Sequence, residues 1–160
     1  MNYEEIKEIL QLIIFGEASI TSKNEKKVIA GVYLNELSYP VGIFDKNEGD
    51  NGIPDPYGVA KNFGAWNNPN ISLKSQFDLA VMIECGMIAN EYVERFKSGE
   101  RGFFDNVVFY ATKQRLKQLG RYGQEPQDIF TKYYPITEVY FPEYFYHRFF
   151  RIVDTEEVKK

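Results

Sequence analysis

The sequence predicts one α+β domain that is mainly helical and carries a small antiparallel sheet. Three observations support this fold class: helical apolar patterns occupy much of residues 1–97, two short strand-like segments follow, and 160 residues suffice for a single sizeable core. The domain is expected to span residues 1–153, with a long loop at 40–70. The charged residues 154–160 are expected to form a tail.

Composition and charge narrow the possible partners. The formal net charge is −4 and charges of both signs are interspersed, so no broad positive field would attract nucleic acid. The single cysteine, Cys85, permits no intramolecular disulfide, which fits synthesis in a reducing cytoplasm. We expect no signal peptide and no membrane span. The sequence calls for no cofactor, and it leaves the oligomeric state open, with a monomer as the expectation.

The first predicted helix carries the candidate catalytic residue. Apolar residues recur with helical spacing from Ile6 to Ile14, and Glu17 falls on the same stripe, about 20° around the axis from Ile6. Removal from water disfavours an ionised carboxyl group, so a buried Glu17 is expected to donate a proton near neutrality. The acids of glycosidases are carboxyl groups of this kind. Alternatively, the helix frays at Gly16 and Glu17 turns into solvent.

A second helix is predicted to run to about Leu37. Ser22 and Glu25 have the spacing of a capping box, which marks its start. Asn35 is a polar residue on an otherwise apolar face. A buried amide must find partners, so Asn35 is expected to bond either to the backbone or to a group of the active site.

The following stretch, from Pro40 to about Pro69, is rich in Gly, Asn, Asp and Pro, which predicts a long, ordered and functional loop. Tyr57 and Trp66 could stack on a sugar or anchor this loop to the core. Three residues invite a calcium interpretation: Asp45, Asn47 and Asp50. The glycine at the sixth position and the glutamate at the twelfth are missing, so no metal site is predicted.

The longest helix signal covers residues 72–97, with Gly99 as its terminator, and predicts a central, largely buried helix. Glu84 lies on its apolar face, either as a second active-site carboxylate or as the partner of an Arg or Lys. Residues 106–111 and 144–152 have strand patterns and could pair antiparallel. A short surface helix is expected at 112–119. His147 is the only histidine and cannot build a metal site alone.

Three segments resemble the opening of the SleB-type cell wall hydrolases, a family that includes spore-cortex-lytic enzymes and phage relatives. They are Ile14-Phe-Gly-Glu-Ala-Ser19, Lys27-Val-Ile-Ala-Gly-Val-Tyr-Leu-Asn35 and Tyr39-Pro40. Val107–Tyr110 and His147–Arg151 resemble later strands of that family. The similarity covers about a third of the chain. It departs from the family after Ala18, where Ser19–Asn24 replaces the usual Gly-Glu.

This resemblance implies a lysozyme-like α+β domain that cleaves the glycan of peptidoglycan between N-acetylmuramic acid and N-acetylglucosamine. The family's catalytic glutamate corresponds to Glu17, and its asparagine corresponds to Asn35. Tyr57, Tyr110 and His147 are further candidates for contact with the substrate, and both tyrosines could instead serve packing. The resemblance also implies action on the cell wall, as a phage lysin or as a virion component made without a signal peptide.

The number of carboxylates decides between two reactions. A hydrolase of this kind needs two, whereas a lytic transglycosylase needs only one acid/base, because the C6 hydroxyl of the sugar is the nucleophile. One carboxylate favours the transglycosylase. A hydrolase would draw its second from four candidates: Asp45, Asp50, Asp55 and Glu84. The rival classes are a non-catalytic glycan-binding or virion structural domain and an intracellular protein-interaction domain.

Overall fold

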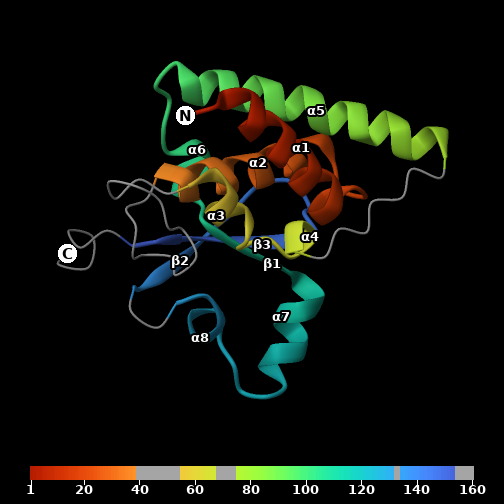
Figure 1. Ribbon diagram of the computed structural model, residues 1–160. Helices are drawn as coiled ribbons and strands as arrows, with labels where there is room; N and C mark the ends of the chain where they lie inside the picture. The colour runs from red at the N-terminus through yellow and green to blue at the C-terminus, as the bar shows by residue number, and fades with distance from the viewer. Residues whose placement is uncertain (39–54, 68–74, 132–133, 154–160) are drawn as a thin grey trace.

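The computed structural model describes residues 1–38, 55–67, 75–131 and 134–153. They form a mainly helical α+β fold with a small antiparallel sheet, as predicted, and the sheet has three strands where two were expected (Figure 1). The loop candidates Asp45, Asn47 and Asp50 and the tail 154–160 lie outside the described residues. The elements are α1 (Tyr3–Ala18), α2 (Lys23–Ser38), α3 (Pro56–Ala60), α4 (Gly64–Asn67), α5 (Gln76–Lys97), α6 (Phe103–Asn106), β1 (Phe109–Thr112), α7 (Lys113–Gly120), α8 (Pro126–Phe130), β2 (Ile136–Val139) and β3 (His147–Ile152).

Polar side chains fix where the helices begin. The Asn2 carboxamide accepts from two N–H groups of the first turn of α1, Ser75 caps α5, and Thr112 caps α7. After α5, Gly99 adopts φ +107°, which suits glycine and ends the helix as predicted. The described part of the predicted long loop contains two short helices, α3 and α4.

The sheet separates two apolar clusters. Strand β3 lies between β1 and β2, and Tyr110 pairs with Phe149 while Phe109 pairs with Phe150. Successive residues of a strand face opposite sides. The first pair faces the main core of α1, α2 and α5, and the second pair packs against Leu116 of α7 and the aromatic ring of α8. In Figure 1, α1, α2 and α5 accordingly lie above the sheet, and α7 and α8 lie below it.

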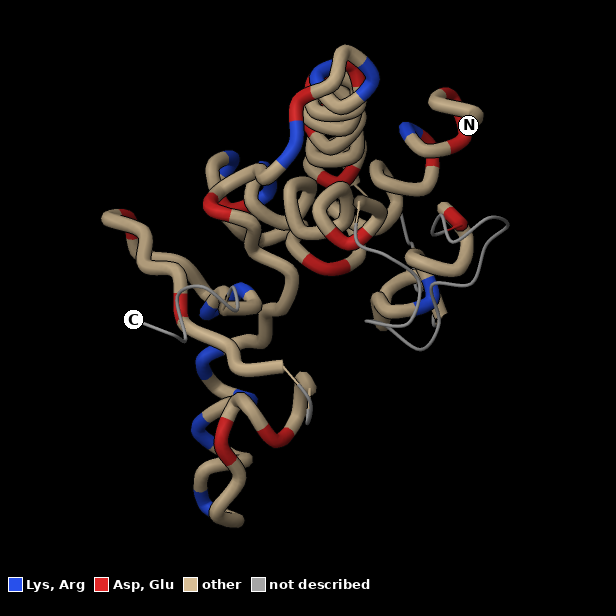
Figure 2. Tube along the Cα trace, turned by 90° about the vertical axis from the view of Figure 1, so that its left-hand side faces the viewer, with Lys and Arg blue, Asp and Glu red and all other residues tan. Residues whose placement is uncertain are grey.

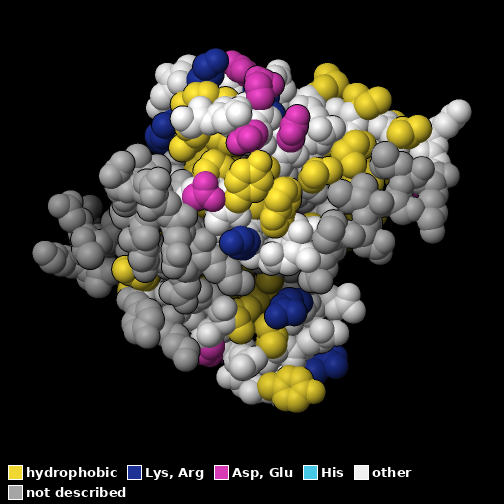
Figure 3. Space-filling model, viewed as in Figure 1, with side chains coloured by type: hydrophobic (Ala, Val, Ile, Leu, Met, Phe, Trp, Pro, Cys, Tyr) yellow, Lys and Arg dark blue, Asp and Glu magenta, His cyan; other side chains and the backbone are white. Residues whose placement is uncertain are grey.

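The prediction that the long helix is central and largely buried is wrong for its first half. Helix α5 packs along α1 through Cys85 and residues beyond it. Three apolar side chains before that contact are largely exposed, Phe77, Leu79 and Ile83, and so is Met87 just beyond Cys85. Figure 3 shows hydrophobic side chains along this outer stretch of α5. Five short elements of the described residues were not predicted: α3, α4, α6, α8 and β2.

Charge is distributed over the described trace without a single dominant sign. Figure 2 shows acidic and basic residues scattered along the described trace, and α7 carries Lys113, Arg115 and Lys117. None of the helices in the described ranges combines the length and the hydropathy that crossing a membrane requires.

Candidate active site

A cavity of about 460 Å³ follows β1, at one edge of the sheet, to the point where the sheet meets the C-terminal ends of α1 and α2. Its volume is in the range of small-ligand sites. Aromatic and aliphatic side chains line one part of it, among them Phe63 and Phe130. The polar side chains that line it are Glu17, Glu36, Asn62, Tyr110, Thr112, Arg115 and His147.

Glu17 lies in the last turn of α1, half-buried, so the helix does not end at Gly16. Its Oε1 accepts a hydrogen bond of 2.9 Å from the backbone N–H of Ala65 in α4. This contact depends on Gly16, because a Cβ at that position would lie 2.5 Å from the Cβ of Ala65. The glycine thus lets α4 approach α1 and give the Glu17 carboxyl group a fixed donor.

Tyr110 holds the same carboxyl group from the sheet. Its hydroxyl hydrogen-bonds to Glu17. Burial first, and then the neighbouring carboxyl groups of Glu17 and Glu36, raise the pKa of Tyr110 well above its ordinary value of 10.0. The phenol therefore keeps its proton and remains a donor. Its ring lies 6.0 Å from that of Phe63 and 5.2 Å, edge to face, from that of His147.

Glu36 is the carboxyl group of the cavity that the sequence analysis did not identify. It is 4% exposed in α2, and burial raises its pKa well above the ordinary value of 4.5, partly opposed by a hydrogen bond from the Asn62 side chain. Its Oε2 has no hydrogen-bond partner among the described residues. Burial therefore favours the protonated form of Glu36, which can donate a hydrogen bond and cannot act as a base.

The second carboxylates considered from sequence have other roles where the structure describes them. The Asp55 side chain caps α3 by accepting from the N–H of Gly58 at 3.0 Å. Glu84 lies 3.7 Å from the ammonium group of Lys26, the pairing that was one of its two predicted alternatives. Neither residue lines the cavity. Asp45 and Asp50 lie outside the described residues.

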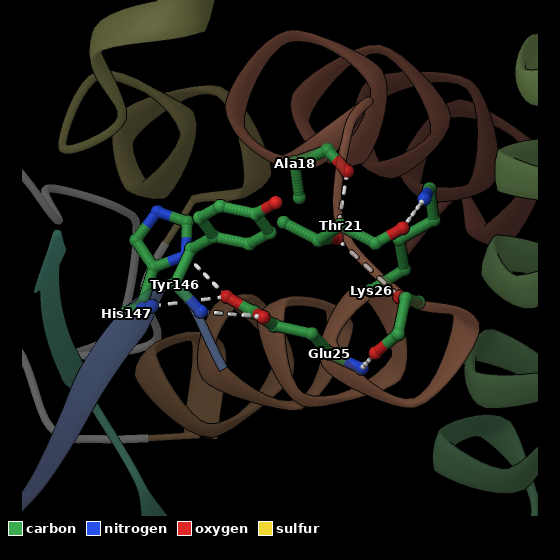
Figure 4. A network of polar contacts seen from close by, with 7 residues as sticks. Ala18, Thr21, Glu25, Lys26, Tyr146 and His147 are labelled. Atoms are coloured by element: carbon green, nitrogen blue, oxygen red, sulfur yellow. Dashed lines mark hydrogen bonds and ion pairs between the residues drawn. The ribbon is translucent and has the colours of Figure 1, made fainter. Parts of the chain in front are cut away.

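The turn between α1 and α2 fixes the two helices relative to each other. The Thr21 hydroxyl donates to the carbonyl of Ala18 at 2.7 Å, and the Lys26 ammonium donates to the carbonyl of Thr21 (Figure 4). Ser22 accepts from the N–H of Glu25 at 3.2 Å, which is one half of the predicted capping box. The other half is not formed, because the Glu25 carboxylate turns to the sheet.

Glu25 holds the start of β3, including His147. Its oxygens accept from the backbone N–H of Tyr146 at 2.9 Å and of His147 at 3.1 Å, and Oε2 lies 2.6 Å from Nδ1 of the His147 ring. Figure 4 shows the imidazole with this nitrogen turned to Glu25. Glu25 is 1% exposed and His147 is 6% exposed. The clamp places the single imidazole at the wall of the cavity.

Asn35 and Tyr57 lie elsewhere. The buried Asn35 amide donates to the carbonyls of Phe103 and Val107, both at 2.8 Å, and its oxygen accepts from the N–H of Phe103 at 2.9 Å. It therefore holds α6, whose Phe104, Asp105 and Asn106 have positive φ, and it does not line the cavity. Tyr57 is 43% exposed beside Trp66, with ring centroids 6.2 Å apart. Of the predicted residues, the cavity brings together Glu17, Tyr110 and His147.

No group of three or more His, Cys, Asp or Glu side chains in the described part of the chain is arranged to hold a metal ion. A scan against protein-family models, a search of curated proteins and a search of solved structures each found no match to this chain. The resemblance to SleB-type hydrolases therefore rests on the sequence motifs alone.

Proposed function

We propose that this protein cleaves the glycan strand of peptidoglycan between N-acetylmuramic acid and N-acetylglucosamine, with Glu17 as the acid/base of a lysozyme-like domain. One observation carries the proposal: a half-buried carboxyl group stands at the wall of a ligand-sized cavity, held by the N–H of Ala65 and the hydroxyl of Tyr110. A general acid needs this combination of fixed geometry and partial removal from water. The motif around Glu17 adds the class of substrate.

The reaction proposed is that of a lytic transglycosylase. Protonated Glu17 gives its proton to the glycosidic oxygen, and the bond from that oxygen to C1 of N-acetylmuramic acid breaks. The carboxylate then takes the proton of the C6 hydroxyl of the same sugar, whose oxygen bonds to C1 and closes a 1,6-anhydro ring. Glu17 ends as it began, protonated. No water is consumed, and no second carboxylate is required.

Glu36 supports this outcome over hydrolysis. A hydrolase would need an ionised second carboxylate to act as nucleophile or to activate water. Glu36 shares the cavity with Glu17, but burial raises its pKa and so disfavours its ionised form. A carboxyl group acts as nucleophile or base only in its ionised form, so its burial makes Glu36 a poor candidate for either role. Hydrolysis by a muramidase route remains the alternative reaction, and it would require a second carboxylate other than Glu36.

The second candidate function is a non-catalytic glycan-binding or virion structural domain. It is favoured by the departure from the family pattern after Ala18, where Ser19–Asn24 replaces the usual Gly-Glu. Under either function we propose that the protein acts on the cell wall, as a phage lysin or as part of a virion.

Mass analysis of products separates these functions. Purified protein is incubated with peptidoglycan, and the soluble muropeptides are weighed for wild type, Glu17→Gln and a matched control, Glu8→Gln, which alters an exposed residue of the same helix. We expect anhydro ends from wild type and the control, and none from Glu17→Gln. Products carrying an added water would support hydrolysis. Binding to the wall without product release would support the non-catalytic domain.

A further inference from the structure

The contact between Glu25 and His147 is more than a link between α2 and β3, because it also determines which nitrogen of the imidazole carries a proton. A carboxylate only accepts hydrogen bonds. Its Oε2 lies 2.6 Å from Nδ1, so Nδ1 must be the donor. In the neutral ring, Nε2 then has no proton and presents a lone pair.

That second nitrogen has no hydrogen-bond partner among the residues that the structure describes. In the described part of the chain, the bonds of the imidazole and of the His147 backbone go to Glu25 and to strand partners, and none reaches Nε2. Among the described residues, Glu36 Oε2 is the one fully buried side-chain polar atom that lacks a hydrogen-bond partner. Nε2 is not in that group. The His147 imidazole is 94% buried, and its Nε2 can still accept a hydrogen bond from a ligand.

The sheet directs this acceptor to the same side as Tyr110. His147 pairs with Thr112, and Tyr110 pairs with Phe149, so His147 and Tyr110 lie two positions apart in the ladder and face the same way. Their rings meet edge to face at 5.2 Å, and both line the cavity together with Glu17. A ligand that reaches Glu17 along β1 therefore passes the imidazole.

We propose that Glu25 is a positioning residue that fixes the His147 tautomer, so that Nε2 accepts a hydrogen bond from a hydroxyl or amide N–H of the bound glycan. The Arg115 guanidinium, which lines the same cavity, can only donate hydrogen bonds, whereas the bare Nε2 can only accept one. A sugar hydroxyl both donates and accepts, so the bare nitrogen complements this wall. The choice of an N-acetylated glycan as ligand rests on the proposed function, whereas the tautomer does not.

Because His147 is the only histidine, its imidazole signals in ¹⁵N NMR are unambiguous. At about pH 8, where imidazole is ordinarily neutral, we expect a protonated Nδ1 and an unprotonated Nε2. Adding the trimer of N-acetylglucosamine should shift the Nε2 resonance more than that of Nδ1. A protonated Nε2 in the free protein, or a trimer that binds without moving this resonance, overturns the proposal.

Glu25→Gln tests the positioning role. The glutamine can still accept from one backbone N–H, but its own amide N–H can face Nδ1 and favour the opposite tautomer, with the proton on Nε2. We expect that tautomer in the spectrum and binding of the trimer at least about fivefold weaker. The control, Glu143→Gln, changes an exposed carboxylate four residues from His147 and should alter neither. A purely structural clamp would lower the melting temperature while leaving the affinity of the folded protein unchanged, which would also refute the proposal.

The wild-type titration stands even where Glu25→Gln does not fold. Its outcome is also distinct from that of the cleavage experiment. Trimer binding that moves Nε2, with no release of muropeptides, would remove the proposed cleavage and keep the His147 site. Muropeptide release together with an Nε2 resonance that the trimer does not move would keep the proposed cleavage and remove the His147 site.

Discussion

The C-terminal ends of α1 and α2 each carry a glutamate at an equivalent helical position, but the two carboxyl groups have different surroundings. Glu17 lies eleven residues after Ile6 on α1, and Glu36 lies eleven residues after Glu25 on α2, so each ends a buried stripe of its helix. Glu17 is half-buried with two fixed donors, whereas Glu36 is buried and keeps an oxygen without a described partner. Helical position brings a carboxyl group to the cavity, but the neighbouring elements decide what it does there.

The largest effect is expected at Asn35, beside Glu36. Asn35→Ala removes three hydrogen bonds and leaves the N–H of Phe103 and two carbonyls unpaired inside the protein. We expect the free energy of unfolding to fall by about 3 kcal/mol or more, measured by urea denaturation. Asn90→Ala, on the exposed side of α5, is the control and should change it by less than about 0.5 kcal/mol. Equal stability of the two variants would mean that α6 is held by other contacts.

The buried Glu36 should make stability depend on pH. Its pKa is raised well above 4.5 in the folded protein, so above that pH the folded state binds a proton that the unfolded chain has lost. The free energy of unfolding should therefore fall by about 1.4 kcal/mol per pH unit, from about pH 4.5 up to the raised pKa. Urea denaturation of wild type and Glu36→Gln at several pH values isolates this contribution. Parallel curves for the two proteins would show that the pKa of Glu36 is not raised in the folded protein.

A smaller effect on stability is expected at Gly16. Gly16→Ala forces α4 away from α1, because the new Cβ would overlap that of Ala65. The gain in helix propensity offsets part of the strain, so we expect a net loss of about 1 kcal/mol. Activity should fall further than stability, since Glu17 loses the N–H of Ala65. Gly120→Ala, where a Cβ meets nothing within 4 Å, is the control. Unchanged muropeptide release by Gly16→Ala would mean that this donor is dispensable.

Sequence periodicity predicted the elements that pack on one face. The amphipathic stripe of α1 placed Glu17 correctly at the boundary of the core, and strand alternation predicted the pairing of β1 with β3. Short elements escaped prediction because four or five residues do not establish a period, which is the case for β2 and α8. The exposed apolar residues of α5 misled the assignment of a central helix, since hydrophobicity alone does not show which face finds a partner.

Two residues of the site were missed for related reasons. Helix α2 is buried on nearly all sides, so no polar face marks the stripe on which Glu36 lies. Glu25 fits a capping box, and local geometry gave no sign that its carboxylate would reach β3, more than 120 residues away. The eleven-residue spacing from Glu25 to Glu36 is the signal that could have paired them.

The central claim is that Glu17, and not Glu36, is the acid/base. The most direct test compares initial rates of muropeptide release from peptidoglycan for wild type, Glu17→Gln and Glu36→Gln, with the folded state of each checked by thermal denaturation. We expect Glu17→Gln to be at least about 100-fold slower and Glu36→Gln to stay within about tenfold of wild type. A Glu17→Gln protein that releases muropeptides at the wild-type rate would contradict the account.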